Sequence, residues 1–491
     1  MSPMSYAGRA GGRSSAPVAL LVMTALVSTL LAFGPRTPAI GQPTPPLPPP
    51  PPPSAPPAPL DDRPNIVVLL TDDQRTETLA SMPQVASLLM SQGTTYTRAM
   101  VPTSLCCPSR ATILTGRYAH SSRLFGNGDV GGARYGGWFR FHELGLEKRT
   151  LGPALQRQGY RTALIGKYLN YFGRFAPTGY VPPGWDTFAT FMSSHGSYYD
   201  YRLSDGSSFG HEPADYSTDV LAARATEFIT TTPADQPLFL YFSPFGPHAP
   251  YTPAPRHLGV LDGALTSYTS LTLDQPLRTM PRWMRARRHF SQAEVDLTRQ
   301  RQLEALMSID EAVGAIGQAL ATTGRERDTL FVFMSDNGYF WGEHRIIGKD
   351  APYAASTSIP MVLRWDGHLP AGGADGRLVL NVDVARTIAV ATGAAMRTDG
   401  INILGARRRQ GFPLEAMRGY NARPAYCGWR TAHRMYVRWN TGEEELYDYR
   451  SDPAEQHNLA RQPAWQDVRT AMRTRAVAAC RPRPPGYRWS H

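Results

Sequence analysis

Four short apolar runs, each followed closely by polar residues, constrain the fold of this chain most. The runs are NIVVLL (65–70), TALI (162–165), PLFLYF (237–242) and TLFVFM (329–334). They are rich in β-branched and aromatic residues and alternate with helical patterns, which is typical of an α/β fold. We therefore expect a large, mainly parallel but mixed sheet between helices, with these runs as central strands.

The polar residues that follow the runs indicate a site at one edge of this sheet. They are Asp72 and Asp73, then Lys167, then His248, then Asp336 and Asn337. In an open parallel sheet, ligands bind beyond the carboxyl ends of the strands, so residues far apart in the sequence can converge there. The three carboxylates and the amide offer hard oxygen ligands, which favour Ca²⁺, with Mg²⁺ as the alternative, over zinc or copper. Each pair is also an ordinary turn sequence, but two such turns after two strands favour a metal site.

Two adjacent cysteines begin a predicted helix in the segment TSLCCPSRATILTG (103–116). Either Thr103 or Ser104 can cap this helix, Pro108 suits its first turn, and Gly116 ends it. Cys106 is thereby placed at a helix N-terminus, where free backbone N–H groups favour an anion.

The residues around this helix start predict an anion site, and the remaining cysteines predict a crosslink. Arg110 adds a bidentate donor for a tetrahedral oxyanion. Adjacent cysteines pair poorly with each other, so the expected disulfide joins Cys427 to Cys480. Cys106 then needs a role other than a disulfide.

The first 60 residues predict export from the cytoplasm. Two arginines precede an uncharged apolar run at 18–33 and a small-residue cleavage site, so residues 1–41 have the pattern of a signal peptide. An uncleaved membrane tether is the alternative. Residues 42–60 are rich in proline and predict an extended spacer.

The net charge of +11 favours anionic partners. The arginines are scattered and accompany no nucleic-acid-binding motif, so we expect a polyanionic substrate and no nucleic acid, with a solvated basic surface as the alternative. The basic segment at 277–289, with Arg285, Arg287 and Arg288, could form a rim for an acidic glycan or simply a solvated loop.

The cysteine segment resembles the signature of the type I sulfatases, Cys-x-Pro-Ser-Arg followed by Thr-Gly-Arg. It reads here Cys106-Cys107-Pro108-Ser109-Arg110 and Thr115-Gly116-Arg117. The segments NIVVLLTDDQ, IGKYLN, SPFGPHAP and MSDNGYFWGEHRIIGK resemble the metal, lysine and histidine segments of the same family. GKYLN, VPPGW and PHAP are most similar to N-acetylglucosamine-6-sulfatases and extracellular heparan 6-sulfatases. The resemblance implies an alkaline-phosphatase-like fold.

The resemblance also implies a mechanism. A formylglycine-generating enzyme would oxidise Cys106 to formylglycine, whose hydrated form attacks sulfur. The metal would be held by Asp72, Asp73, Asp336, Asn337 and the modified residue 106. Lys167 and Lys349 would bind the sulfate, and His248 would protonate the leaving alcohol. Many arylsulfatases read Gly-Lys-x-His at the lysine segment, whereas Leu169 and Asn170 follow Lys167-Tyr168 here, and Asn170 would orient the attacking hydroxyl. His120 and His344 are the other candidates for that assistance.

These features predict domains and a function. Residues 61–400 would form the catalytic domain, with a helix over 299–320 packed on the sheet, and 401–491 a small antiparallel α+β subdomain. The expected activity is that of a secreted sulfatase acting on a carbohydrate or aryl sulfate, with a 6-O-sulfated glucosamine-like unit favoured. The alternatives are a phosphodiesterase or phosphonate hydrolase of the same superfamily, and a non-catalytic polyanion-binding surface protein in which Cys106 stays a thiol. No sequence feature sets an oligomeric state.

Overall fold

A computed structural model describes residues 63–130, 133–270, 272–273, 280–419 and 422–489. The predicted signal peptide and spacer lie outside these residues. Within the described part of the chain, no helix is both long enough and apolar enough to cross a membrane.

The main sheet has eight strands in the order β14-β2-β13-β10-β1-β9-β5-β6. Its strands are β1 (Asn65–Thr71), β2 (Thr94–Met100), β5 (Arg161–Gly166), β6 (Thr187–Ala189), β9 (Leu238–Ser243), β10 (Thr329–Ser335), β13 (Met361–Arg364) and β14 (Gly373–Leu380). Among these strands, β13 runs antiparallel to both of its neighbours and the other pairs are parallel. The four predicted runs form the adjacent strands β10, β1, β9 and β5, which confirms the expected mainly parallel, mixed sheet.

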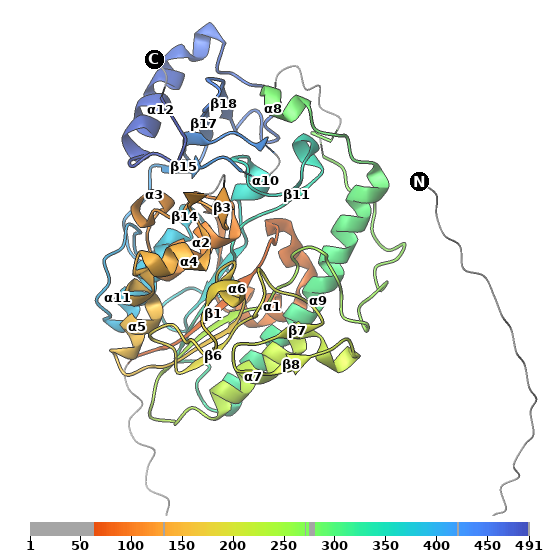
Figure 1. The fold of residues 1–491 in the computed structure, drawn as a ribbon, viewed down its shortest axis with the longest axis vertical. Coiled ribbons are helices and arrows are strands. Elements are labelled where there is room, and N and C mark those ends of the chain that lie inside the picture. The colour runs from red at the N-terminus through yellow and green to blue at the C-terminus, as the bar shows by residue number, and fades with distance from the viewer. Residues whose placement is uncertain (1–62, 131–132, 271, 274–279, 420–421, 490–491) are drawn as a thin grey trace, which may run out of the picture. The chain divides into compact units, whose positions relative to one another are not determined.

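Helices cover both faces of this sheet (Figure 1). The side chains of β1 alternate between two buried clusters, with Ile66, Val68 and Leu70 on one face and Val67 and Leu69 on the other. A central strand buried on both sides needs a continuous apolar run, as NIVVLL provides. Helices α2 (Cys106–Thr115), α4 (Gly137–Glu143), α5 (Leu151–Gln156) and α11 (Val382–Thr392) pack on the first face, and α7 (Ser217–Thr230) and α9 (Gln292–Thr322) pack on the second.

Helix α9 is longer than the predicted helix at 299–320. A capping box begins it, in which the Ser291 side chain accepts from the Glu294 N–H and the Glu294 side chain accepts from the Ser291 N–H. Of the apolar face expected to pack on the sheet, Leu303, Leu306, Val313, Ile316 and Leu320 are buried in the second cluster. Met307 is only partly buried, which differs from that expectation.

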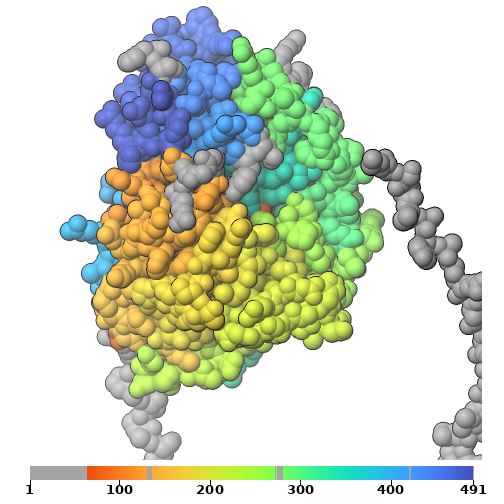
Figure 2. Space-filling view, viewed as in Figure 1, coloured from red at the N-terminus to blue at the C-terminus, as the bar shows by residue number. Residues whose placement is uncertain are grey.

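A second, four-stranded antiparallel sheet follows, as the sequence predicted. Its strands are β15 (Phe412–Ala416), β16 (Tyr426–Arg430), β17 (Arg434–Trp439) and β18 (Glu444–Asp448), and α12 (Gln466–Ala479) packs beside it. Leu378 and Leu380 of β14 share one apolar cluster with Phe412 and Leu414 of β15, so the two sheets are joined through a common core. In Figure 2 the blue C-terminal residues border both the orange and the green parts of the main body.

The predicted disulfide between Cys427 and Cys480 is not formed in this structure. Both residues are buried in one small cluster with Ala425 and Tyr487, but each is a free thiol. Packing alone brings the two side chains together, whereas a bond between them also requires an oxidant.

The remaining elements are short and lie in the connections. They are the helical segments η1 (Thr76–Ser81), α1 (Pro83–Val85), η2 (Ala86–Met90), α3 (Ala119–Ser122), η3 (Leu146–Arg149), α6 (Phe172–Phe175), η4 (Pro213–Asp215), α8 (Arg282–Arg285), η6 (Glu343–Arg345), α10 (Ala354–Thr357) and η8 (Pro463–Trp465), and the strand pairs β3 (Asp129–Val130) with β4 (Ala133–Arg134), β7 (Tyr201–Arg202) with β8 (Ser208–Phe209), and β11 (Phe340–Trp341) with β12 (Ile347–Gly348).

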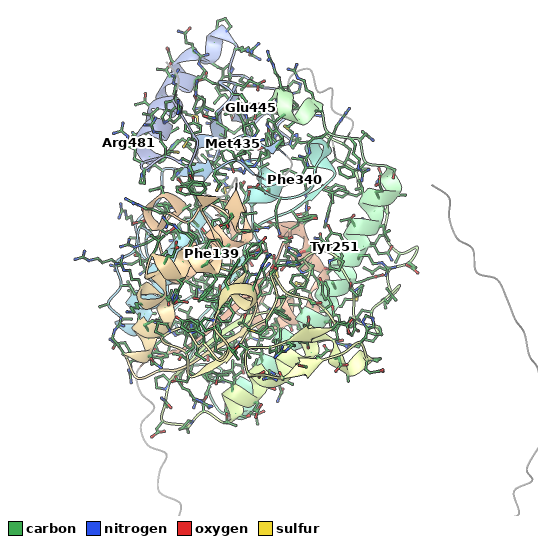
Figure 3. The ribbon with its side chains drawn as sticks, viewed as in Figure 1. Phe139, Tyr251, Phe340, Met435, Glu445 and Arg481 are labelled. Carbon is green, nitrogen blue, oxygen red and sulfur yellow. The ribbon has the colours of Figure 1, made fainter. Side chains whose placement is uncertain are left out.

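A buried carboxyl group marks the junction of the small sheet with the rest of the chain. Glu445 of β18 is 1% exposed and accepts hydrogen bonds of 2.9 and 3.1 Å from the Tyr353 hydroxyl. Figure 3 labels it near Met435, with Phe340 close by. Burial, reinforced by the charges of Glu455 and Glu443, raises the pKa of Glu445 to about 8.

We expect this carboxyl group to make stability fall as pH rises. The folded pKa lies above the unfolded value, so the folded chain keeps a proton that the unfolded chain loses, and stability declines between about pH 4.5 and pH 8. Glu445→Gln keeps the shape but cannot ionise. Thermal unfolding of both proteins should show that the Tm of the variant, relative to that of the wild type, is higher at pH 8 than at pH 5. Parallel pH profiles would contradict this account.

Candidate active site

Arg110 connects the ends of four neighbouring strands. Its side chain is fully buried. Its Nε donates to Asp336 Oδ2 at 2.7 Å and its Nη2 to Asp72 Oδ2 at 3.1 Å. Its Nη1 donates to the Lys167 carbonyl at 2.8 Å and to Ser243 Oγ at 2.7 Å. The acceptors lie at the carboxyl ends of β10, β1, β5 and β9, so the predicted convergence is present.

The expectation that Arg110 binds an oxyanion with two donors stays a prediction, and the hydrogen bonds show how many of its donors bind protein groups. A guanidinium has five N–H groups. Four of them donate to protein acceptors among the described residues, which leaves one on Nη2. Arg110 therefore holds the strand ends in place and retains a single donor for a ligand.

Helix α2 begins at Cys106 and ends at Thr115, and its C-cap Gly116 has a φ of 67°. Its N-cap is Leu105, which makes no side-chain cap, so the sequence prediction of Thr103 or Ser104 as the cap is wrong. Those two hydroxyls donate instead to the carbonyls of Glu415 and Ala351.

The surroundings of the two adjacent cysteines differ. Cys107 belongs to the apolar cluster on one face of the sheet, and its N–H donates to Asn127 Oδ1 at 2.8 Å. Cys106 is fully buried, and its Sγ lies 3.6 Å from Asp72 Oδ1. Burial and the Asp72 charge raise the pKa of Cys106 to about 12, so its thiol is protonated at neutral pH. Cys106 thus faces the carboxylates and Cys107 faces the core.

The side chains predicted to bind a metal fit one. Oxygen atoms of Asp72, Asp73 and Asp336 lie within 4.8 Å of one another, and all three residues are buried. The Asn337 amide nitrogen donates to Asp73 Oδ1 at 2.7 Å, while its Oδ1 is buried without a hydrogen-bond partner among the described residues. Three carboxylates and one unsatisfied amide oxygen form an all-oxygen donor set, which suits Ca²⁺ or Mg²⁺.

Two lysines balance these carboxylates together with Arg110. Lys349 Nζ lies 2.5 and 2.6 Å from the two oxygens of Asp73, and Lys167 Nζ donates to Asp72 Oδ2. Each ammonium has three N–H groups, so Lys167 retains two donors for a substrate and Lys349 retains one. Three cations against three carboxylates leave the cluster near neutrality, and a bound divalent cation would make it positive and attractive to an anionic substrate.

His248 borders the same cluster. Its Nε2 lies 3.8 Å from Asp73 Oδ2, and its Nδ1 hydrogen-bonds the Ala249 carbonyl at 2.7 Å. Burial and the charges of Lys349 and Lys167 lower the pKa of His248 well below its usual value. In the neutral form that follows, Nδ1 carries the proton and Nε2 presents a lone pair to the site.

A second histidine at the site was missed by sequence reasoning. The His195 ring lies 5.9 Å from the His248 ring and 6.0 Å from the Phe245 ring, between centroids. Burial and the Lys167 charge lower its pKa. It comes from a polar loop after β6 and follows no apolar run directly, so the strand-end rule could not find it. Ser243, the last residue of β9, was missed because a serine there carries no distinctive signal.

The other candidate histidines are engaged elsewhere. His120 Nδ1 lies 2.9 Å from Glu415 Oε1, and His344 Nε2 lies 3.6 Å from Glu455 Oε2. Asn170 is buried, and its side-chain oxygen has no hydrogen-bond partner among the described residues, so it remains a candidate for orienting a ligand.

A pocket of about 200 Å³ borders this site at His248 and Lys349. Its lining comprises Leu105, Asn127, His248, Trp283, Arg287, Ile346, Ile347, Gly348, Lys349, Asp350, Ala351 and Arg423. Larger hollows exist, including one of about 470 Å³ beside Arg75 and Tyr268. We assign the site to the smaller pocket because His248 and Lys349 line it.

We expect Ca²⁺ or Mg²⁺ to stabilise the folded protein at this cluster. An ion that binds only the native state raises the melting temperature. Added to chelator-treated protein, either ion should raise the Tm of the wild type and of the control Asp262→Asn, whose side chain is exposed. Asp73→Asn should lose the shift. Asp73 has a φ of 68°, a conformation that asparagine tolerates, so this variant keeps the backbone. A larger shift with Zn²⁺ would contradict an all-oxygen site.

Comparisons with known proteins place these residues in a family context. The chain is 31% identical over 362 residues to human N-acetylglucosamine-6-sulfatase, covering 70% of this chain and 64% of that protein. It is 30% identical over 342 residues to the extracellular sulfatase SULF-1 homolog of Drosophila melanogaster, covering 66% of this chain and 29% of that protein. The chain thus spans less than two thirds of the length of these relatives.

Solved structures share the fold. One is a protein in complex with its substrate D-glucosamine-2-N,6-O-disulfate, with a TM-score of 0.73 and 20% identity over 85% of this chain and 97% of that one. The phosphonate monoester hydrolase of Agrobacterium radiobacter has a TM-score of 0.66 and 19% identity over 85% of this chain and 95% of that one. At these identities the likeness concerns the fold.

The family model described as Sulfatase matches residues 64–394, which include every strand of the main sheet and every residue of the carboxylate cluster. This chain belongs to the sulfatase family.

Proposed function

We propose that this protein hydrolyses sulfate esters of a carbohydrate, with a 6-O-sulfated glucosamine-like unit as its preferred substrate. The observation that carries the proposal is the position of Cys106, in the first turn of α2 and 3.6 Å from the Asp72 carboxylate. Conversion of this residue to formylglycine by a formylglycine-generating enzyme would put the reactive group beside the predicted metal ligands.

The divalent cation and the modified side chain at position 106 would supply distinct chemistry. A divalent cation held by Asp72, Asp73, Asp336, Asn337 and the modified residue 106 would polarise oxygens bound to it. The aldehyde at position 106, once hydrated, would supply a hydroxyl nucleophile together with a second hydroxyl that a serine lacks.

The surrounding side chains would bind the substrate and move protons. Lys167 and Lys349 would neutralise the sulfate charge in a site where burial strengthens electrostatic attraction. Arg110 would fix two of the carboxylate ligands and contribute its remaining N–H. His248 would exchange a proton at Nε2 with the leaving alcohol, and a neutral resting His248 must first take up that proton. Asn170 would orient the attacking hydroxyl through its unpaired amide oxygen.

The names of the relatives support the proposed substrate and compartment. Matches named N-acetylglucosamine-6-sulfatase and extracellular sulfatase support a sulfated glucosamine unit and action outside the cytoplasm. The net charge of +11 is compatible with an acidic glycan. Residues 1–41 would act as the export signal and 42–60 as the spacer, ahead of a catalytic domain over 61–400 and a subdomain over 401–491.

We expect Cys106→Ser to lower kcat for sulfate ester hydrolysis by several orders of magnitude, because it removes the precursor of the nucleophile. Cys107→Ala should retain most of the activity, since Cys107 faces the apolar core. The measurement is steady-state hydrolysis of an aryl sulfate and of N-acetylglucosamine-6-O-sulfate. Equal loss in both variants would refute the assignment of position 106.

Two further measurements separate this proposal from its alternatives. The mass of the tryptic peptide containing residue 106 distinguishes formylglycine from cysteine, and cysteine alone would favour a non-catalytic binding protein. Parallel assays with an aryl phosphate diester and a phosphonate monoester should give much lower kcat/KM values than the sulfate esters. The reverse order would indicate a phosphodiesterase or phosphonate hydrolase.

A further inference from the structure

The structure separates the three arginines of the basic segment after residue 280. Arg285 Nε donates to the Met280 carbonyl at 2.9 Å, and Arg285 lines a different pocket with Glu443, Glu444 and Glu445. The Arg288 side chain is 62% exposed and pairs with Glu294 at 2.8 Å. Arg287 lines the active-site pocket with His248 and Lys349. Of these three, Arg287 is the arginine positioned to meet a substrate.

The guanidinium of Arg287 has no acidic partner among the described residues. Its Nε donates to the Arg345 carbonyl at 3.1 Å, and its side chain lies 5.7 Å from the centre of the Trp283 ring. Neither Nη group donates to a described residue, so up to four N–H groups remain for a ligand. Burial lowers the pKa of Arg287, and no nearby carboxylate offsets the effect. A half-buried cation without a counter-charge is costly, and an anionic ligand would relieve that cost.

A second arginine of the pocket, Arg423, has a structural role. Arg423 lines the same pocket but is 3% exposed, and it donates to Asp350, to the Met417 carbonyl and to the Pro424 carbonyl. Its charge and most of its donors are already matched within the protein. Arg287 differs in both respects, so its position is not explained by packing.

Trp283 lies beside Arg287 in the lining of the pocket. The Trp283 ring packs on Trp439 of β17, with 5.2 Å between ring centroids, and this contact anchors α8 on the small sheet. The indole Nε1 is buried without a hydrogen-bond partner among the described residues. The ring centre lies 5.7 Å from the Arg287 guanidinium, so this N–H is a second unpaired donor on the residue beside it.

We propose that Arg287, with the Trp283 indole N–H beside it, binds a second anionic group of the substrate, distinct from the sulfate that is cleaved. The inference rests on the proposed function, since it places the scissile sulfate at Lys349 and His248. It assigns the substrate class as a sulfated sugar with a further negative group, either a second sulfate on the same ring or the carboxylate of an adjoining sugar. Arg287 is then a specificity-determining residue for this reaction.

The first test compares substrates on the full-length enzyme. The panel is N-acetylglucosamine-6-O-sulfate, glucosamine-2-N,6-O-disulfate, and a disaccharide of N-acetylglucosamine-6-O-sulfate with a uronic acid. Arg287→Gln should lower kcat/KM for at least one doubly anionic substrate by about 10-fold to 100-fold, as loss of a hydrogen bond to a charged group does. The loss for the singly sulfated sugar should be much smaller, and Arg287→Lys should restore part of the difference. Comparing the losses for the disulfated sugar and for the uronic-acid disaccharide identifies whether the second charge is a sulfate or a carboxylate.

Arg288→Gln and Arg285→Gln are the matched controls, because each removes an arginine of the same segment that lies outside the pocket. Both should keep the wild-type preference. If Arg287→Gln lowers kcat/KM equally for all three substrates, or changes it for none, the proposal is wrong while the sulfatase activity stands.

A second measurement does not depend on turnover. Isothermal titration with glucosamine-2-N-sulfate and with the uronic-acid disaccharide lacking its 6-sulfate should show weaker binding of at least one ligand to Arg287→Gln than to Arg288→Gln. If the wild type hydrolyses no sulfate ester, the proposed function fails and this titration alone decides the role of Arg287. Equal dissociation constants in the two variants would overturn it.

Discussion

The fully buried guanidinium of Arg110 is the interaction on which the rest of the site depends. It donates to groups at the ends of β1, β5, β9 and β10, strands separated by up to 264 residues in the sequence. Asp72 and Asp336 would repel each other without it. Removing one partner of such a buried charge pair costs about 3–5 kcal/mol, because the other charges stay buried and unpaired. Arg110 therefore offsets the repulsion between the buried carboxylates, which lets the sheet bring them together where a metal could bind.

The carboxylate cluster and the helix N-terminus complement each other. Parallel strands direct their carboxyl ends to one edge, and helix α2 starts at that edge with Cys106 in its first turn. Free N–H groups at a helix start favour an anion, whereas the carboxylates favour a cation. A residue at this boundary can contact both kinds of ligand. The same boundary explains the different surroundings of Cys106 and Cys107, one facing polar groups and the other facing the core.

The small C-terminal sheet contributes to the pocket as well as to the core. Trp439 supports Trp283, and Trp283 in turn lies beside Arg287. Arg423, which precedes β16, holds Asp350 next to the catalytic candidate Lys349. The two supporting residues, Trp439 and Arg423, lie beyond the segment matched by the family model, which ends at residue 394. Such a division lets substrate preference change while the strand-end chemistry stays the same.

The sequence by itself determined the central strands, the start and end of α2, and the identity of the carboxylate, lysine and histidine candidates. Most of these features follow from local rules, since apolar runs and helix signals depend on neighbouring residues, whereas Lys349 was indicated only by the family resemblance. Only the tertiary structure decided that Arg110 donates four hydrogen bonds to strand ends and that His195 lies beside His248. It also decided that, of the three arginines in the basic segment, Arg287 lines the pocket. Those outcomes depend on contacts between residues far apart in the chain, which no local pattern encodes.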